Sequence, residues 1–303
     1  MATSTPTSST ERIAAHATTR SRVGLGRLTG VGILVGIVML ITATAILIPI
    51  VYALLGGFKT NGQLAANPAQ VIPNPWILDN YVDVIVGEYA PVFWREFANS
   101  LVVAIVSVAV TVMVAALAAF VFARFAFRGR EALFTLFVFG LLFPTAVAIL
   151  PLFVLIRQVG LTGNLLGVAL PQAAFALPLT IVILRPFFRS IPAELEDAAR
   201  IDGCSSFGFF WRVLLPLARP ALATVSVLAV VGTWNAFLLP LIVLNGAEQW
   251  TLPLGVMNFA TEYSSDDAKV LAFTVVSLIP AIAFYAVAER QLVGGLTSGA
   301  VKG

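Results

Sequence analysis

The segment Glu194–Pro220, ELEDAARIDGCSSFGFFWRVLLPLARP, determines how this chain is interpreted, because its composition differs from that of its surroundings. It carries four acids and three arginines, whereas charged residues make up only 11% of the 303-residue chain and hydrophobic residues make up 59%. A chain with a mean hydropathy of +0.96 cannot form a soluble surface. We therefore expect an integral membrane protein in which this segment is a water-facing loop.

Six uncharged runs are long enough to cross roughly 30 Å of hydrocarbon as helices of about 20 residues. They lack the alternating pattern of outer-membrane barrel strands, so the predicted fold class is all-α with six transmembrane helices. The runs are Leu28–Phe58, Leu101–Ala123, Ala132–Ile156, Gln158–Leu184, Ala221–Ala247 and Val270–Ala288. We expect residues 1–27 to be a disordered tail, residues 28–292 to be one domain, and residues 293–303 to be a second tail.

Fourteen of the eighteen Lys and Arg side chains fall in tails and loops on the same side of the membrane as the N-terminus. Basic loops remain in the cytoplasm. Both termini and the loop 189–219 are therefore predicted to be cytoplasmic. The net charge of +3 reflects this topology and does not indicate a nucleic-acid partner.

The residue inventory contains little that could support catalysis. His16 and Cys204 are the only histidine and cysteine, so we expect no metal cluster and no disulfide. Gly56–Thr60, GGFKT, has phenylalanine where a phosphate-binding loop needs glycine. The six runs also have no ionisable side chain in their interiors. We expect no enzyme activity and no cofactor, and any energy for transport must come from another subunit.

Local signals divide the cytoplasmic loop into two helices. Ser190-Ile-Pro-Ala-Glu is typical of a helix start, and Gly203 suits the left-handed position after a helix end. The pair Ala198-Ala199 leaves no bulk, so the surface of a partner could approach the backbone. The following segment is expected to pack on the membrane helices through residues at helical spacing, namely Phe207, Phe210, Trp211 and Leu214.

The spacing of this loop resembles the EAA signature of permease subunits in ABC importers, which is Glu-Ala-Ala, three residues, Gly, nine residues, Ile-x-Leu-Pro. Here Asp197-Ala198-Ala199 is followed after three residues by Gly203 and after nine more by Val213-Leu214-Leu215-Pro216. Asp replaces Glu, which keeps the charge and shortens its reach. The alternative for any charged interhelical loop is a solvated amphipathic segment without a partner.

Further motifs resemble one branch of that family, the carbohydrate importers similar to the maltose transporter, and within it the second, six-span permease. They are Asn99-Ser100-Leu101, Phe122-Ala123-Arg124, Phe175-Ala176-Leu177-Pro178, Trp234-Asn235 and the ending Gly295–Gly303. The resemblance implies import of a sugar, as a di- or oligosaccharide, through the cytoplasmic membrane of a bacterium or archaeon. The alternatives are a permease for an amino acid, a peptide or glycerol phosphate, and a membrane scaffold that transports nothing.

The same resemblance implies partners. They are a second permease subunit, a dimer of ATP-binding cassette ATPase subunits, an extracytoplasmic sugar-binding protein and the lipid bilayer. The outer loops Lys59–Asn99 and Gly246–Lys269 are large enough to contact such a binding protein, and a solvated cap is the alternative. The binding protein usually selects the solute, so this chain does not encode which sugar is carried.

Three sets of site residues follow from the resemblance and from the neutral polar groups in the runs. The expected ATPase-coupling residues are Glu194, Glu196, Asp197, Ala198, Ala199, Asp202, Gly203 and Pro216. The C-terminal tail is expected to reach between the ATPase subunits through Ser298, Gly299 and Lys302. Gln172, Trp234 and Asn235 are candidates for the translocation pathway, with ordinary kinking at nearby prolines as the alternative.

Overall fold

The computed structural model describes residues 30–260 and 265–300, with side chains at 32–260 and 265–286. The expected tail 1–27 and Lys302 lie outside the described residues. The chain divides into two compact units, Met1–Val51 and Tyr52–Gly303. Helix α1 (Gly30–Gly56) begins in the first unit, where none of the described side chains is buried.

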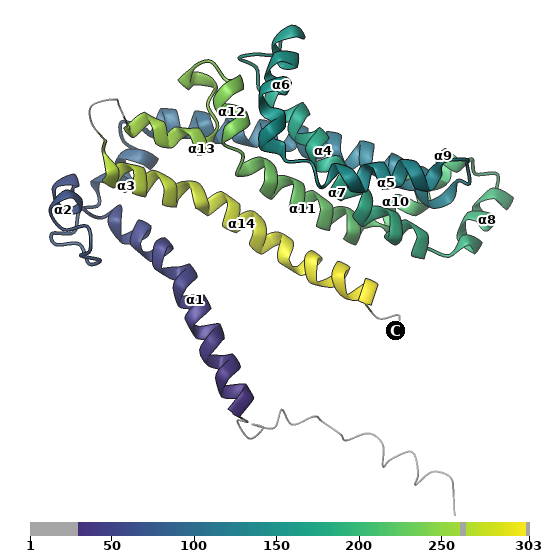
Figure 1. Cartoon of the computed structure of the whole chain (residues 1–303), viewed down its shortest axis with the longest axis horizontal. Helices are drawn as coiled ribbons and strands as arrows, with labels where there is room; N and C mark the ends of the chain where they lie inside the picture. The colour runs from purple at the N-terminus through teal and green to yellow at the C-terminus, as the bar shows by residue number, and fades with distance from the viewer. Residues whose placement is uncertain (1–29, 261–264, 301–303) are drawn as a thin grey trace, which may run out of the picture. The chain divides into compact units, whose positions relative to one another are not determined.

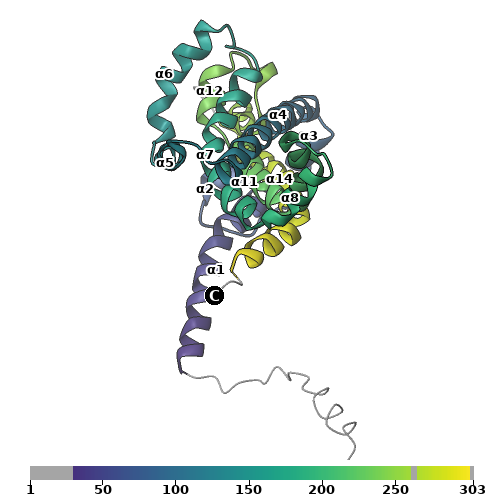
Figure 2. The same ribbon diagram turned by 90° about the vertical axis from the view of Figure 1, so that its right-hand side faces the viewer.

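The second unit is built on four long helices that run alongside one another in Figures 1 and 2. These are α4 (Ala90–Arg124), α7 (Leu166–Ser190), α11 (Arg219–Trp234) and α14 (Asp267–Ala300). The most extensive contact joins α4 and α7, and α11 packs against the other three. Since the only β pairing in the described residues is a single bridge between Ala260 and Ser265, the all-α prediction is confirmed.

Short helices connect the long ones and cover their ends. Figure 1 shows α8 at one end of the long helices and α2, α3 and α13 at the other. The short elements are α2 (Asn61–Ala66), α3 (Asp79–Ile85), α5 (Arg130–Gly140), α6 (Thr145–Gln158), α8 (Ala193–Ile201), α9 (Ser206–Phe209), η2 (Phe210–Leu214), α10 (Leu215–Leu217), α12 (Leu238–Val243), η3 (Ala247–Gln249), α13 (Leu252–Gly255) and η4 (Val256–Phe259).

Small side chains allow α4 and α7 to pack closely. Ala115 and Ala119 of α4 are fully buried, and Ala173 of α7 is 1% exposed. The Thr111 hydroxyl donates to the Ala173 carbonyl at 3.3 Å. Contacts of this kind associate helices in a bilayer, where apolar side chains gain little by leaving lipid.

Four helices in the described part are long and apolar enough to cross a membrane, and the number rises to six if each of two bent helix pairs is one span. The predicted run Ala132–Ile156 is one such pair, because α5 and α6 meet at 99°, a corner visible in Figure 2. Pro144 precedes α6. A proline lacks the amide proton that a helix needs and displaces the residue before it from helical geometry.

Other predicted boundaries also shift. The run expected over Ala221–Ala247 is divided into two helices: α11 ends at Trp234, and α12 begins at Leu238. The run expected from Gln158 becomes helical only at Leu166, since Gly160 and Gly163 adopt φ of +73° and +67°. The backbone of α14 remains helical to Ala300, through most of the expected tail.

Candidate functional site

The helix α8 lies in the cytoplasmic loop predicted from the sequence, and its two ends form differently. The predicted helix start is confirmed, since α8 begins at Ala193, but serine does not cap it: Pro192 occupies the N-cap position, and the Ser190 hydroxyl donates back to the Phe187 carbonyl at 2.8 Å. At the other end, the prediction for Gly203 is confirmed by its φ of +80°. The amides of Gly203 and Cys204 donate to the carbonyls of Arg200 and Ala199, which closes the helix.

The two faces of α8 differ in exposure. Asp197 and Ala198 are exposed, whereas Ala199 is partly buried and packs against the core, so only one alanine of the pair is open to a partner. Glu196 is 8% exposed and faces inward. Among the remaining predicted coupling residues, the exposed ones are Glu194, Asp202, Gly203 and Pro216.

Glu196 is held by two arginines. Its Oε1 accepts a hydrogen bond from Arg200 Nη2 at 2.7 Å, one turn along α8. Its Oε2 lies 3.9 Å from Nε of Arg124, the last residue of α4. The structure therefore places Glu196 between α8 and α4, apart from the exposed face formed by the other acids.

The segment after Gly203 packs with a different register from the one expected. Phe210 and Leu214 are buried as predicted, but the prediction is wrong for Phe207 and Trp211, which are 64% and 44% exposed. Phe209 is buried instead. Residues 210–214 form a π-helical turn, whose i to i+5 hydrogen bonds rotate successive side chains away from the 3.6-residue spacing.

Two exposed apolar side chains extend the exposed surface of the loop. Ile201, at the end of α8, is 86% exposed, and Phe207 follows in α9. Ile201 lies four residues after Asp197 on α8 and therefore on the same face, and it is not among the predicted coupling residues. Phe207 was missed because its spacing matched a buried face.

A second charged cluster at this end was not predicted. Glu131 of α5 accepts hydrogen bonds from Arg185 and Arg189 of α7. Arg185 is 4% exposed, donates to the Phe122 carbonyl at 3.3 Å and lies 3.9 Å from the centroid of the Phe134 ring. These contacts connect α5, α7 and the end of α4 beside the loop.

The pathway candidates lie in two different cavities. Gln172 lines a cavity of about 510 Å³ between the α5–α6 corner, α7 and α11, together with Thr145, Thr180 and Thr233. The Thr180 hydroxyl donates to the Ala176 carbonyl, and the Thr233 hydroxyl bonds to that of Ser107. The side chains of Gln172 and Thr145 make no hydrogen bond to another described protein group.

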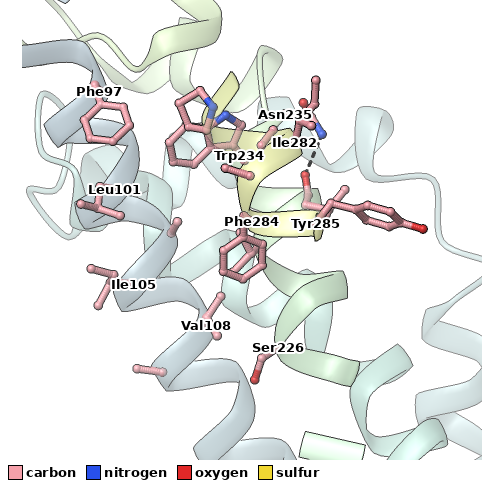
Figure 3. A pocket seen from close by; sticks show the side chains of 17 residues that line it. Phe97, Leu101, Ile105, Val108, Ser226, Trp234, Asn235, Ile282, Phe284 and Tyr285 are labelled. Carbon is pink, nitrogen blue, oxygen red and sulfur yellow. Dashed lines mark hydrogen bonds between the residues drawn. The ribbon is translucent and has the colours of Figure 1, made fainter. Parts of the chain in front are cut away.

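Trp234 and Asn235 line a separate groove of about 920 Å³ between α4, α11 and α14. Figure 3 shows this groove with Phe97, Leu101 and Phe284 around it. The Asn235 amide donates to the Val231 carbonyl of its own helix at 3.0 Å, so one of its two N–H donors is already bonded. The structure therefore does not bring Gln172 together with the other two candidates.

The predicted C-terminal contact falls at the limit of the described residues. Ser298 and Gly299 belong to the helical backbone of α14. Their side-chain environment and the whole of Lys302 lie outside the described part, so this contact remains a prediction.

Comparison with known proteins agrees with the loop motif. Residues 111–291 match the family model described as binding-protein-dependent transport system inner membrane component. The diacetylchitobiose uptake permease NgcG of Streptomyces coelicolor is 33% identical, with 86% of each chain covered. The arabinooligosaccharides transport permease AraQ of Halalkalibacterium halodurans is 33% identical over 84% of this chain and 91% of its own. The trehalose transport permease SugB of Mycobacterium tuberculosis is 35% identical over 77% and 85%.

The fold matches a solved structure over nearly all of both chains. A chain in the crystal structure of a bacterial ABC transporter involved in the import of the acidic polysaccharide alginate aligns with a TM-score of 0.73. It is 24% identical, and the alignment covers 95% of this chain and 99% of that one. The match to the family model and the similarity to these relatives show that the chain belongs to the family of binding-protein-dependent transport system inner membrane components, the permease subunits of ABC importers.

Proposed function

We propose that this chain is one of two permease subunits in an ATP-driven importer of a di- or oligosaccharide. Its relatives include permeases named for diacetylchitobiose, arabinooligosaccharides and trehalose, which supports a sugar as the solute. The partners in this proposal are a second permease, a dimer of ATPase subunits and an extracytoplasmic sugar-binding protein. The chain supplies the path and the partners supply ATP hydrolysis and solute selection.

The exposed face of α8 is the observation that carries this proposal. Asp197, Ala198 and Ile201 are open to solvent, and the opposite face is fixed to the protein through Glu196. An amphipathic helix with such a face fits a groove on another protein. We propose that the ATPase subunit provides that groove and that ATP-driven closure moves α8.

The orientation follows from charge. The side of the membrane that carries α8 also carries most of the arginines, which places it in the cytoplasm by the positive-inside rule. The proposed location is the cytoplasmic membrane of a bacterium or archaeon, with both termini inside.

The cavity that contains Gln172 is the proposed solute-facing surface. Its lining has neutral polar groups and the aromatic residues Phe143 and Phe175, with no charged side chain. Amide and hydroxyl groups can exchange hydrogen bonds with sugar hydroxyls without the desolvation cost of a charge. Trp234 and Asn235 are left as weaker candidates by the apolar lining of their groove.

The test is uptake by the complete complex in proteoliposomes, with Ala198→Trp compared with Ala126→Trp. Ala126 is also exposed but lies in the link between α4 and α5, outside the loop 189–219. A bulky side chain on the docking face should weaken the ATPase contact by about 1.4 kcal/mol or more and reduce uptake roughly tenfold.

Uptake of sugars, amino acids and peptides by the unmodified complex identifies the solute class. Normal uptake and ATPase co-purification in Ala198→Trp would contradict docking on this face, and uptake restricted to amino acids or peptides would contradict the sugar.

A further inference from the structure

The helix α4 is bonded at its outer end to the segment 248–258. The Asn99 amide donates to the carbonyls of Glu248 and Trp250 at 3.1 and 3.0 Å. One residue further along, the Ser100 hydroxyl accepts from the buried Leu252 amide at 2.8 Å. These bonds join an outer loop directly to one face of α4.

A fourth contact adds to this attachment. Glu96, one turn before Ser100, is fully buried, and its Oε1 accepts from the Asn258 amide at 2.8 Å. Gly255 packs directly against the other carboxylate oxygen, leaving no room for a side chain there. The outer loop therefore cannot shift along α4 without breaking several buried contacts.

The inner end of α4 is bonded in a comparable way to the loop 189–219, which contains α8 and is called the coupling loop below. Arg124 Nη2 donates to the Ile191 carbonyl just before α8 at 2.7 Å. The same guanidinium faces Glu196 of α8 and lies 6.0 Å from the centroid of the Phe209 ring in α9. The side chain of Arg124 is 8% exposed, so a single arginine joins α4 to three parts of the loop.

Between these two attachments α4 is an uninterrupted helix. It has 35 residues, a length of about 52 Å, with no glycine and no proline after Pro91. Helices bend sharply at proline, at glycine or where the hydrogen-bond ladder is interrupted. Of the other helices that adjoin the loop, α7 contains Pro171, Pro178 and Pro186, and α11 (Arg219–Trp234) ends before the segment 248–258. The unbroken connection between the outer loop and α8 therefore runs through α4.

We propose that Arg124 and Glu196 are positioning residues that make α4 the element through which a partner on the outer loop 248–258 controls α8. This inference rests on the proposed function, because it needs a binding protein outside and an ATPase inside. When the outer loop moves with its partner, α4 moves with it, and the pair formed by Arg124 and Glu196 carries that movement to the docking face. Neither residue has to touch ATP, the ATPase or the solute.

The experiment measures ATP hydrolysis by the reconstituted complex with and without its binding protein. Arg124→Gln should still assemble with the ATPase and hydrolyse ATP at the unstimulated rate, but the stimulation by the binding protein should fall roughly fivefold or more. Glu196→Gln, which keeps size and removes charge, should act in the same direction. Arg124→Lys should retain part of the stimulation, since an ammonium group can keep one of the contacts. Arg200→Gln is the matched control, because it removes the exposed partner of Glu196 and leaves Arg124 in place.

A double-variant cycle connects the two ends. Asn99→Ala should also reduce stimulation, and combining it with Arg124→Gln should add little, because one broken connection already interrupts the same path. Unchanged stimulation in both Arg124→Gln and Glu196→Gln would overturn the proposal, as would full additivity with Asn99→Ala. If one of these variants fails to insert, the other still decides. If the unmodified chain binds no ATPase, the proposed function itself is wrong, and the inference is overturned with it.

Discussion

Both ends of α4 are attached to a neighbouring loop, but by different kinds of side chain. At the inner end, Arg124 faces the carboxylate of Glu196, which in turn accepts from Arg200, whose side chain is 57% exposed. At the outer end, Asn99 and Ser100 bond to backbone groups of the adjoining loop. Charges join the helix to the coupling loop, whereas mainly neutral groups join it to the outer loop.

The difference lies in access to water. At the inner end only Arg200 reaches water, because its side chain is 57% exposed, whereas those of Arg124 and Glu196 are 8% and 10% exposed. Water can therefore replace the Arg200 contact of Glu196, but breaking the Arg124 contact would leave buried charges unpaired. At the outer end, Ser100 and Leu252 are both buried, and an unpaired amide there would have no replacement partner. The outer attachment and the pair of Arg124 and Glu196 therefore behave as part of the core, and the contact between Arg200 and Glu196 is the one that can open and close.

The largest stability effect is expected from Gly255→Ala at the outer end. A Cβ atom at this position would collide with Glu96 Oε2 and with the Phe273 ring, both of which are buried. Overpacking of this kind costs about 3 kcal/mol. The measurement is the free energy of unfolding in detergent.

Gly232→Ala in α11 is the control for that substitution, because a Cβ there meets no atom within 4 Å. It should leave stability unchanged or raise it slightly, since alanine is the better helix former. Equal losses in the two variants would show that the outer loop is not packed tightly on α4.

A smaller loss is expected from Ser100→Ala. This change removes the acceptor of the Leu252 amide and leaves a buried donor without a partner, which costs about 1.5 kcal/mol. Ser190→Ala is a suitable comparison, because the Ser190 hydroxyl is exposed and donates only to a carbonyl of its own helix. If the two serine variants are equally stable, water replaces the lost acceptor and the outer attachment is more open than its burial indicates.

The sequence predicted the local features of the loop, because local chemistry determines them. Gly203 ends α8 as expected, since a left-handed residue there has to be glycine or a close substitute. The spacing from Asp197 to Pro216 identified the family. The inward orientation of Glu196 could not be predicted, because its partner Arg124 lies far earlier in the chain and only tertiary packing brings the two together.

Departures from regular helix geometry were also beyond the sequence reasoning. The run Ala132–Ile156 was predicted to be one helix, whereas α5 and α6 meet at 99° next to Pro144. Trp211 lies in a π-helical turn, and a spacing rule of 3.6 residues cannot predict its exposure. Hydropathy likewise cannot separate the Gln172 cavity from the Trp234 groove, since both lie within apolar runs.

The smallest effect is expected at the inner end, from Arg200→Gln. The ion pair between Arg200 and Glu196 is an i, i+4 contact on α8 with one exposed partner, and such pairs contribute about 0.5 kcal/mol or less. Because Arg124 remains beside Glu196, the carboxylate keeps a positive neighbour, and the exposed oxygen can be hydrated where Arg200 was. The loss should shrink further as salt is added, because exposed charges are screened within about 10 Å at 0.1 M. Unfolding of the unmodified and Arg200→Gln chains at low and high salt measures this, with Ser100→Ala as a reference whose effect should not depend on salt. A salt-independent loss as large as that of Ser100→Ala would mean that the contact between Arg200 and Glu196 is sealed from water, and the contrast between the buried attachments of α4 and this exchangeable contact would then be wrong.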